Sequence, residues 1–297
     1  RKMASRTEEF DSRFAGLDQW SDDDFLMALW EGQMRAVASV GPVLGDLATA
    51  ANGIARRLAG GGRLVYVGAG TSGTVAWQDA KELGGTFGWP EEHTIVMLAG
   101  GLQSKPEDFN GAEDDADLAS DEIAQHHITE QDAVIGIAAS GATPYTVCAI
   151  EKARERGAYT VGICNNPDGK ILDIAECGIY LESAPEVVAG STRMGAGTAQ
   201  KTALNILSTL VMNKLGRLFD NLMVGMRAEN IKLHERAIRI VVHIASCDEA
   251  QAKAALEKSK FDIRSAVLVV KGHAPARAQE ILALSNGNLR AALEYRD

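Results

Sequence analysis

The sequence predicts an α/β fold in which a five-stranded parallel sheet is covered by helices on both faces. Between residues 60 and 181, short apolar runs alternate with helical stretches, and each run is almost continuously apolar, as in strands buried on both sides. A glycine-rich turn follows the first run directly, which is typical of the passage from strand to helix in such folds. The predicted strands are residues 64–67, 94–98, 133–138, 159–164 and 178–181.

The first sixty residues predict helices, interrupted near Gly41 and Pro42. Ser21 precedes three aspartates at the start of an amphipathic run, so it is expected to cap a helix whose dipole favours those acids. We therefore expect a helical N-terminal region over residues 1–50, before the α/β domain of residues 51–244.

Beyond the last predicted strand, a polar loop leads into a long helix over about 198–215 and another over about 226–245. The remaining segments are helical in pattern and are divided by Gly272, by Pro275 and by Asn286 with Gly287. Residues 245–297 are therefore expected to form a small appendage of three or four helices.

Composition restricts the classes of partner. The 297 residues carry a formal net charge of −10, which argues against nucleic acid or an anionic membrane surface as a partner. No run of about 18 apolar residues is present to span a bilayer. The spacings of the cysteines form neither a CxxC motif nor a disulfide framework, so we expect a reducing, cytoplasmic setting. The four cysteines are Cys148, Cys164, Cys177 and Cys247.

The first glycine-rich turn, VGAGTSG, places Gly68, Gly70 and Gly73 in a GxGxxG pattern. A dinucleotide fold would also place an acidic residue at the end of its second strand to hold the ribose hydroxyls. Here that strand ends in the neutral stretch 98–101, and the lysine of a P-loop is missing as well. We therefore expect neither a nucleotide nor any other cofactor, and no metal.

A second hydroxyl-rich turn, AASGATPYT, follows the third predicted strand. Both turns are expected at the carboxyl ends of strands, where free helix N–H groups and the helix dipole favour an anion. Backbone amides and hydroxyl groups there satisfy a phosphate monoester without a metal. The predicted phosphate-binding residues are Thr71, Ser72, Gly73, Ser140, Gly141 and Thr143.

A third loop of this kind contains Ser191, Thr192 and Arg193. The alternative is that these hydroxyls only cap their own helices, and for one loop alone the two interpretations are equally good. The three loops together favour a phosphate ligand.

Several segments resemble the sugar-isomerase (SIS) superfamily and, within it, the N-acetylmuramic acid 6-phosphate etherases. They are GGGRLVYVGAGTSG, DAKE, GAEDD, IAASGATPYT, VGICNNP and EVVAGSTRMGAGTAQKTALNILST, and they span roughly residues 58–235. The resemblance implies a three-layer SIS sandwich, with a C-terminal helical segment similar to a ubiquitin-associated fold.

The resembling family converts N-acetylmuramate 6-phosphate and water into N-acetylglucosamine 6-phosphate and D-lactate during recycling of cell-wall sugar. The resemblance implies that Glu82 and Glu113 are catalytic, the first protonating departing lactate and the second removing the C2 proton. Two carboxylates in different environments can divide these roles, but the residues alone do not say which is acid and which is base. Without the resemblance, Glu82 reads as a surface residue and Glu113 as an acid at a helix N-terminus.

Other candidates carry two interpretations each. Arg193 either faces an anionic group of the substrate or forms a structural ion pair, and Lys201 either binds ligand or is solvated. His234 either assists ring opening, in its own or a partner's site, or is an ordinary polar helix residue. Residues 126 and 127 are both histidine, but neighbours on a helix point to different faces and form no metal pair.

Eight residues separate Thr74 from Glu82, about 12 Å along a helix, so one subunit need not complete the site. SIS proteins commonly share an active site between neighbouring chains. The resemblance therefore implies a homodimer at least.

Four positions depart from the etherase pattern. Thr74 stands where relatives usually carry Arg, residues 84–85 are Gly-Gly in place of Pro-Pro, and Gly195 stands where they carry Lys. The lost cations leave the exact sugar phosphate open. An etherase is favoured; the alternatives are a SIS sugar-phosphate isomerase and a non-catalytic sensor similar to glucokinase regulatory protein, which a single SIS core disfavours.

Overall fold

The computed structural model describes residues 6–101, 111–183 and 185–296 of the chain. The predicted α/β fold is confirmed: five strands form one parallel sheet in the order β2-β1-β3-β4-β5. Each predicted strand is present within one residue of its expected ends. The strands are β1 (Leu64–Gly68), β2 (Thr94–Leu98), β3 (Ala133–Ile137), β4 (Tyr159–Cys164) and β5 (Cys177–Tyr180).

The strand order creates a switch point between β1 and β3. From β1 the chain crosses to β2 on one side, then returns to β3 on the other side, and continues outward to β4 and β5. In open α/β sheets, ligands bind in the crevice at the carboxyl ends of the strands beside such a reversal. Gly68 and Ile137, the last residues of β1 and β3, are paired in register, so the loops that follow them leave the sheet side by side.

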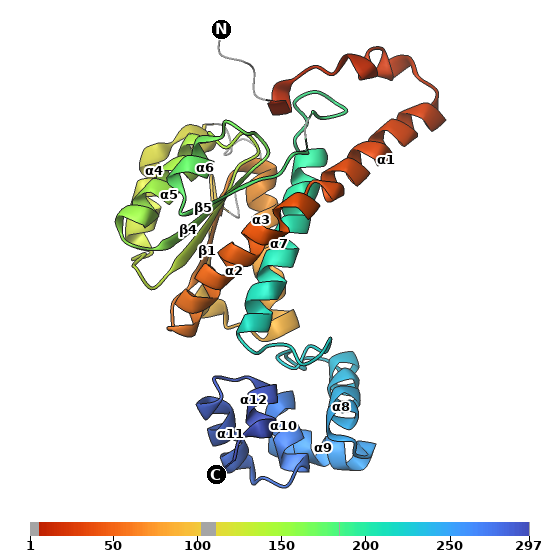
Figure 1. Ribbon diagram of the computed structural model, residues 1–297, viewed down its shortest axis with the longest axis vertical. Helices are drawn as coiled ribbons and strands as arrows, with labels where there is room; N and C mark the ends of the chain where they lie inside the picture. The colour runs from red at the N-terminus through yellow and green to blue at the C-terminus, as the bar shows by residue number, and fades with distance from the viewer. Residues whose placement is uncertain (1–5, 102–110, 184, 297) are drawn as a thin grey trace. The chain divides into compact units, whose positions relative to one another are not determined.

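Helices cover both faces of the sheet (Figure 1). One face carries α4 (Ala116–Gln125), α5 (Pro144–Glu155) and α6 (Lys170–Ile174), whose apolar side chains form a core with those of β1 and β3. The other face carries α2 (Leu44–Ala59), α3 (Gly70–Phe87) and α7 (Gly195–Lys214). The three strands in the middle of the sheet are buried along their whole length, which explains their continuous apolar sequences.

The N-terminal region is helical, as predicted. Helix α1 (Asp22–Ala38) begins after Ser21, whose hydroxyl accepts the Asp24 N–H, and the break at Gly41 and Pro42 is the 3₁₀ turn η4 (Gly41–Val43). The other short 3₁₀ turns of the described residues are η1 (Arg6–Glu8), η2 (Ser12–Phe14), η3 (Leu17–Gln19), η5 (Glu91–His93) and η7 (Ala112–Asp114). Within the described ranges, no helix is both long and apolar enough to cross a membrane.

Contacts divide the chain into two compact units. The first contains the described residues up to Ala80 and those from Glu92 to Ser208; the second contains Lys81–Glu91 and the described residues from Thr209 onward. The helices that lie wholly in the second unit are α8 (Ile231–Ala245), α9 (Glu249–Lys258), α10 (Ile263–Val270), α11 (Pro275–Leu284) and α12 (Leu289–Glu294).

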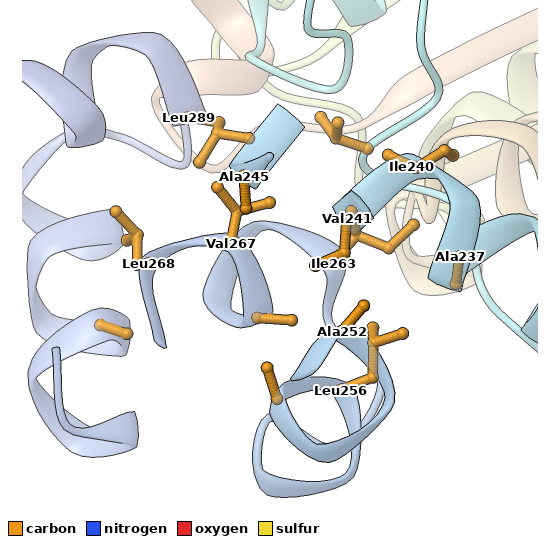
Figure 2. Close-up of a cluster of buried hydrophobic side chains, with 14 of the residues drawn as sticks. Ala237, Ile240, Val241, Ala245, Ala252, Leu256, Ile263, Val267, Leu268 and Leu289 are labelled. Atoms are coloured by element: carbon orange, nitrogen blue, oxygen red, sulfur yellow. The ribbon is translucent and has the colours of Figure 1, made fainter. Parts of the chain in front are cut away.

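Helix α8 shares a hydrophobic core with the helices that follow it. Ala237 and Val241 of α8 belong to the same buried cluster as Leu256, Ile263 and Val267 (Figure 2). The predicted domain boundary at residue 245 thus falls between α8 and α9, which share this core. The predicted start of α8 near residue 226 was five residues early, because the Asn230 side chain accepts the Leu233 N–H and caps the helix there.

Candidate functional site

The first loop is shaped by a close approach of α3 to β1. A Cβ atom on Gly68 would lie 2.9 Å from the backbone of Gly73, and one on Gly73 would lie 2.9 Å from the Gly68 carbonyl oxygen and against the Leu98 side chain. These glycines are therefore required by strand–helix packing. Because α3 begins at Gly70, the amides of its first turn have no partner within the helix.

The hydroxyls of this loop do not cap their own helix. Among the residues that the structure describes, the Thr71 and Ser72 side chains have no hydrogen-bond partner, although Ser72 is only 7% exposed. The Thr74 hydroxyl, in contrast, donates to the Gly70 carbonyl at 3.1 Å. The capping alternative is thus not observed for Thr71 and Ser72, the two hydroxyls of this loop that are predicted to bind phosphate.

The second loop joins β3 to α5. The Ser140 hydroxyl accepts the Ala142 N–H at 3.2 Å and lies 3.4 Å from the Thr143 hydroxyl, which makes no capping hydrogen bond although Thr143 is the N-cap residue. Gly141 has φ +69°, and a Cβ there would lie 2.5 Å from the Gly169 Cα. Ser140 therefore stabilises its own turn, while Thr143 does not cap α5 through its side chain.

The third loop meets the first at Gly197 of α7. A Cβ on Gly197 would lie 3.1 Å from the Thr71 methyl group and 3.3 Å from the Thr192 carbonyl oxygen. Ser191 and Thr192 are half-buried and Arg193 is exposed. The Arg193 guanidinium contacts the Met194 sulfur at 3.3 Å and, among the described residues, has no carboxylate partner, so the ion-pair alternative is not observed there.

Glu186 is a site residue that the sequence analysis missed. It is 4% exposed, and its carboxylate accepts the backbone N–H groups of Gly195 and Ala196, both at 2.8 Å. Burial raises its pKa, while those two amides oppose the rise. The internal carboxylate therefore occupies the N-terminus of α7 and starts that helix at Gly195, three residues before the predicted start.

Asp79 is a second missed residue. It is 2% exposed on α3, and its carboxylate accepts hydrogen bonds from Tyr66 of β1 at 2.8 Å and from Asn205 and Ser208 of α7 at 2.5 and 3.1 Å. Burial raises the pKa of Asp79, and the three hydrogen bonds act in the opposite direction. The carboxylate thus joins three elements of the first unit.

The two predicted catalytic glutamates lie in different units. Glu82 is exposed on α3, one turn after Asp79, in the part of that helix that belongs to the second unit. Glu113 is exposed in η7, which packs against α5, the helix that follows the second loop. Asp115 caps α4 by accepting the Leu118 N–H at 2.9 Å, and Glu113 lies just before that helix N-terminus, as the dipole interpretation also expects.

His234 has contacts within the second unit. Its Nε2 atom lies 2.8 Å from the Ala228 carbonyl oxygen, and its ring stacks on Phe261 with 4.4 Å between ring centroids. These contacts fit the interpretation of His234 as a polar helix residue.

Comparison with known proteins gives three results. Residues 43–165 match the SIS domain family model. The chain is 41% identical over 289 residues to the N-acetylmuramic acid 6-phosphate etherase of Deinococcus radiodurans, covering 97% of this chain and 95% of that protein. It is 40% identical to the etherase of the same name from Streptomyces avermitilis, covering 97% and 93%. A phosphoheptose isomerase structure from Francisella tularensis overlaps 65% of this chain and 97% of its own, with 16% identity and a TM-score of 0.46.

Proposed function

Because this chain belongs to the N-acetylmuramic acid 6-phosphate etherase family, we propose that it cleaves the D-lactyl ether of N-acetylmuramate 6-phosphate, giving N-acetylglucosamine 6-phosphate and D-lactate. The observation that carries the proposal is the pair of loops after β1 and β3. They leave neighbouring strands at the switch point of the sheet, and three of their hydroxyls serve no helix cap.

In this proposal the phosphate group lies at the N-termini of α3 and α5. Thr71, Ser72 and Thr143 donate hydroxyl hydrogen bonds, and first-turn amides with the two helix dipoles stabilise the negative charge. Ser140 and Gly141 hold the shape of the second loop, and Gly73 lets α3 approach the strand. The ligand is thus held mainly by neutral donors.

The elimination requires a base that removes the C2 proton and an acid that protonates the leaving group. Opening the sugar ring forms an aldehyde at C1, which makes the C2 proton acidic. Glu113 takes that proton, the C2–C3 double bond forms as the C3–O bond breaks, and Glu82 protonates the departing lactate oxygen. Water then adds its hydroxyl to C3 and a proton to C2.

We further propose a homodimer in which a second copy covers one face of α1. Leu26, Trp30, Met34 and Val37 recur at helical spacing and are 61%, 59%, 54% and 47% exposed. An apolar stripe of this length on a helix marks an interaction surface. A partner seated there brings its own residues to a shared site.

We also propose a cytoplasmic location and a division into three parts, residues 1–50, 51–244 and 245–297. Four free thiols, at Cys148, Cys164, Cys177 and Cys247, support a reducing compartment.

The test is direct. Purified protein is incubated with N-acetylmuramate 6-phosphate, and D-lactate is measured with D-lactate dehydrogenase. We expect release by the wild type and loss of at least about 100-fold in kcat for Glu82→Gln and for Glu113→Gln. Asp114→Asn, an exposed neighbour in the same 3₁₀ turn, is the matched control and should retain activity. Ketose formation without lactate, or tight binding without turnover, would refute the proposal.

A further inference from the structure

The buried carboxylate of Asp79 fixes the orientation of an amide group. Asn205 donates its Nδ2 to Asp79 Oδ1, so its Oδ1 atom points away from the carboxylate and accepts the Lys201 ammonium group at 2.8 Å. A flipped amide would place its oxygen against the carboxylate and its NH₂ against the ammonium group. Both contacts would be repulsive, so Asp79 and Asn205 together hold Lys201 in one position.

The same face of α7 carries Lys201 and the contact to the first loop. Gly197, Lys201, Asn205 and Ser208 are spaced by four, four and three residues, which places them on one stripe of the helix. The stripe faces α3, because Gly197 borders the Thr71 side chain at one end, and Asn205 and Ser208 bond Asp79 at the other. Lys201 lies between these contacts, about 6 Å of helix rise from Gly197.

Positive charge is scarce around the predicted phosphate-binding loops. Thr74 and Gly195, close to the first and third loops, are uncharged, Arg193 of the third loop is exposed, and Lys201 is the first basic residue of α7. A cation beside the neutral donors would strengthen binding of a substrate that carries a phosphate and a carboxylate, because hydrogen bonds between charged groups are about twice as strong as neutral ones. Lys201 is half-buried, where its charge is less screened than on the open surface.

We propose that Lys201 binds an anionic group of the sugar phosphate and that Asp79 is the residue that positions it, acting through Asn205. The inference rests on the proposed function, because it names a cation for the same site. Asp79 touches no substrate in this account; it determines where the Lys201 ammonium group is held.

The experiment is a double-mutant cycle between Asp79→Asn and Lys201→Met. The first variant removes the negative charge and keeps the shape: its amide oxygen accepts from Asn205 and Ser208, and its NH₂ meets the Tyr66 hydroxyl, which can accept. We measure the Kd of N-acetylglucosamine 6-phosphate by calorimetry, and KM and kcat for lactate release. Lys201→Met should raise Kd and KM about tenfold.

Asp79→Asn should raise Kd and KM about threefold, with kcat changed by less than about twofold. In the Lys201→Met background it should add nothing, because its effect passes through the lysine. Asn205→Ala removes the acceptor for Lys201 together with one hydrogen bond to the Asp79 carboxylate, and should couple to Lys201→Met in the same way. Ser208→Ala is the control: it removes a hydrogen bond to Asp79 and keeps the hydrogen bond between Lys201 and Asn205, so it should lower Tm and leave Kd unchanged.

The inference would be overturned if Asp79→Asn weakened binding of the sugar phosphate equally with and without Lys201. It would also be overturned if Asp79→Asn lowered Tm but left Kd and KM unchanged. Wild-type protein that binds N-acetylglucosamine 6-phosphate but releases no lactate would overturn the proposed function alone, since the Kd cycle still tests the positioning. Lactate release with no coupling in the cycle would overturn the positioning alone.

Discussion

Gly141→Ala is expected to reduce both stability and sugar-phosphate binding. The residue has φ +69°, which costs an alanine about 1–2 kcal/mol. The new Cβ would also lie 2.5 Å from the Gly169 Cα and 2.9 Å from the Cys164 sulfur, and displacing packed neighbours costs about 1–3 kcal/mol more. The free energy of unfolding should therefore fall by about 2–5 kcal/mol, out of the roughly 5–15 kcal/mol that is ordinary for a domain.

The matched control is Gly61→Ala. Gly61 has φ +90° but no atom within 4 Å of an added Cβ, so it carries the backbone cost alone. Urea unfolding followed by circular dichroism gives both free energies. Calorimetry with N-acetylglucosamine 6-phosphate should show at least about tenfold weaker binding for Gly141→Ala, because Ser140 and Thr143 move with the loop, and wild-type binding for Gly61→Ala. Equal losses of stability in the two variants, or unchanged binding in Gly141→Ala, would refute the reasoning.

Three further outcomes are expected. Burial raises the pKa of the Asp132 carboxyl, but the hydrogen bonds from Arg63 outweigh it and hold that pKa below the ordinary value. The ion pair therefore stabilises the fold at pH values above the ordinary carboxyl pKa, and this stabilisation is lost as the pH falls through the lowered pKa of Asp132. Asp132→Asn should lower the free energy of unfolding at pH 7 by about 2–3 kcal/mol and flatten its acid dependence in urea titrations. Trp30→Glu should halve the mass seen in sedimentation velocity and reduce lactate release; an intact dimer would contradict the α1 interface. Glu186→Gln should lower the free energy of unfolding by about 1 kcal/mol in the same titrations and leave sugar-phosphate affinity unchanged.

The strands could be predicted because burial on both faces produces continuous apolar runs, a signal that lies within each segment. The strand order could not, because it depends on which runs pair, and periodicity carries no such information. Asp79 was missed for the same reason: its partners on α7 lie far along the chain, and in its own helix it looks like any polar residue. Glu186 was missed because it lies in an irregular loop, where an acid carries no pattern.

The hydroxyl loops were predictable because Ser, Thr and Gly cluster after apolar runs, but their chemistry was not. Only the structure distinguishes Ser140 from Thr71 and Ser72. The Ser140 hydroxyl accepts a backbone N–H of its own turn, whereas the Thr71 and Ser72 hydroxyls have no hydrogen-bond partner among the described residues. The resemblance supplied Glu82 and Glu113; spacing alone did not distinguish them from ordinary surface acids. Their catalytic roles stay predictions.

The carboxylate of Glu186 makes the N-terminus of α7 electrostatically different from those of α3 and α5. The three helices start beside the strand-end loops, yet at α7 the first amides already face a negative charge from the same chain. A free anion arriving from solvent is attracted to the starts of α3 and α5 and repelled from the third. For the proposed substrate, which has a negative group at each end, we expect this asymmetry to favour one direction: phosphate towards α3 and α5, and the lactyl end elsewhere.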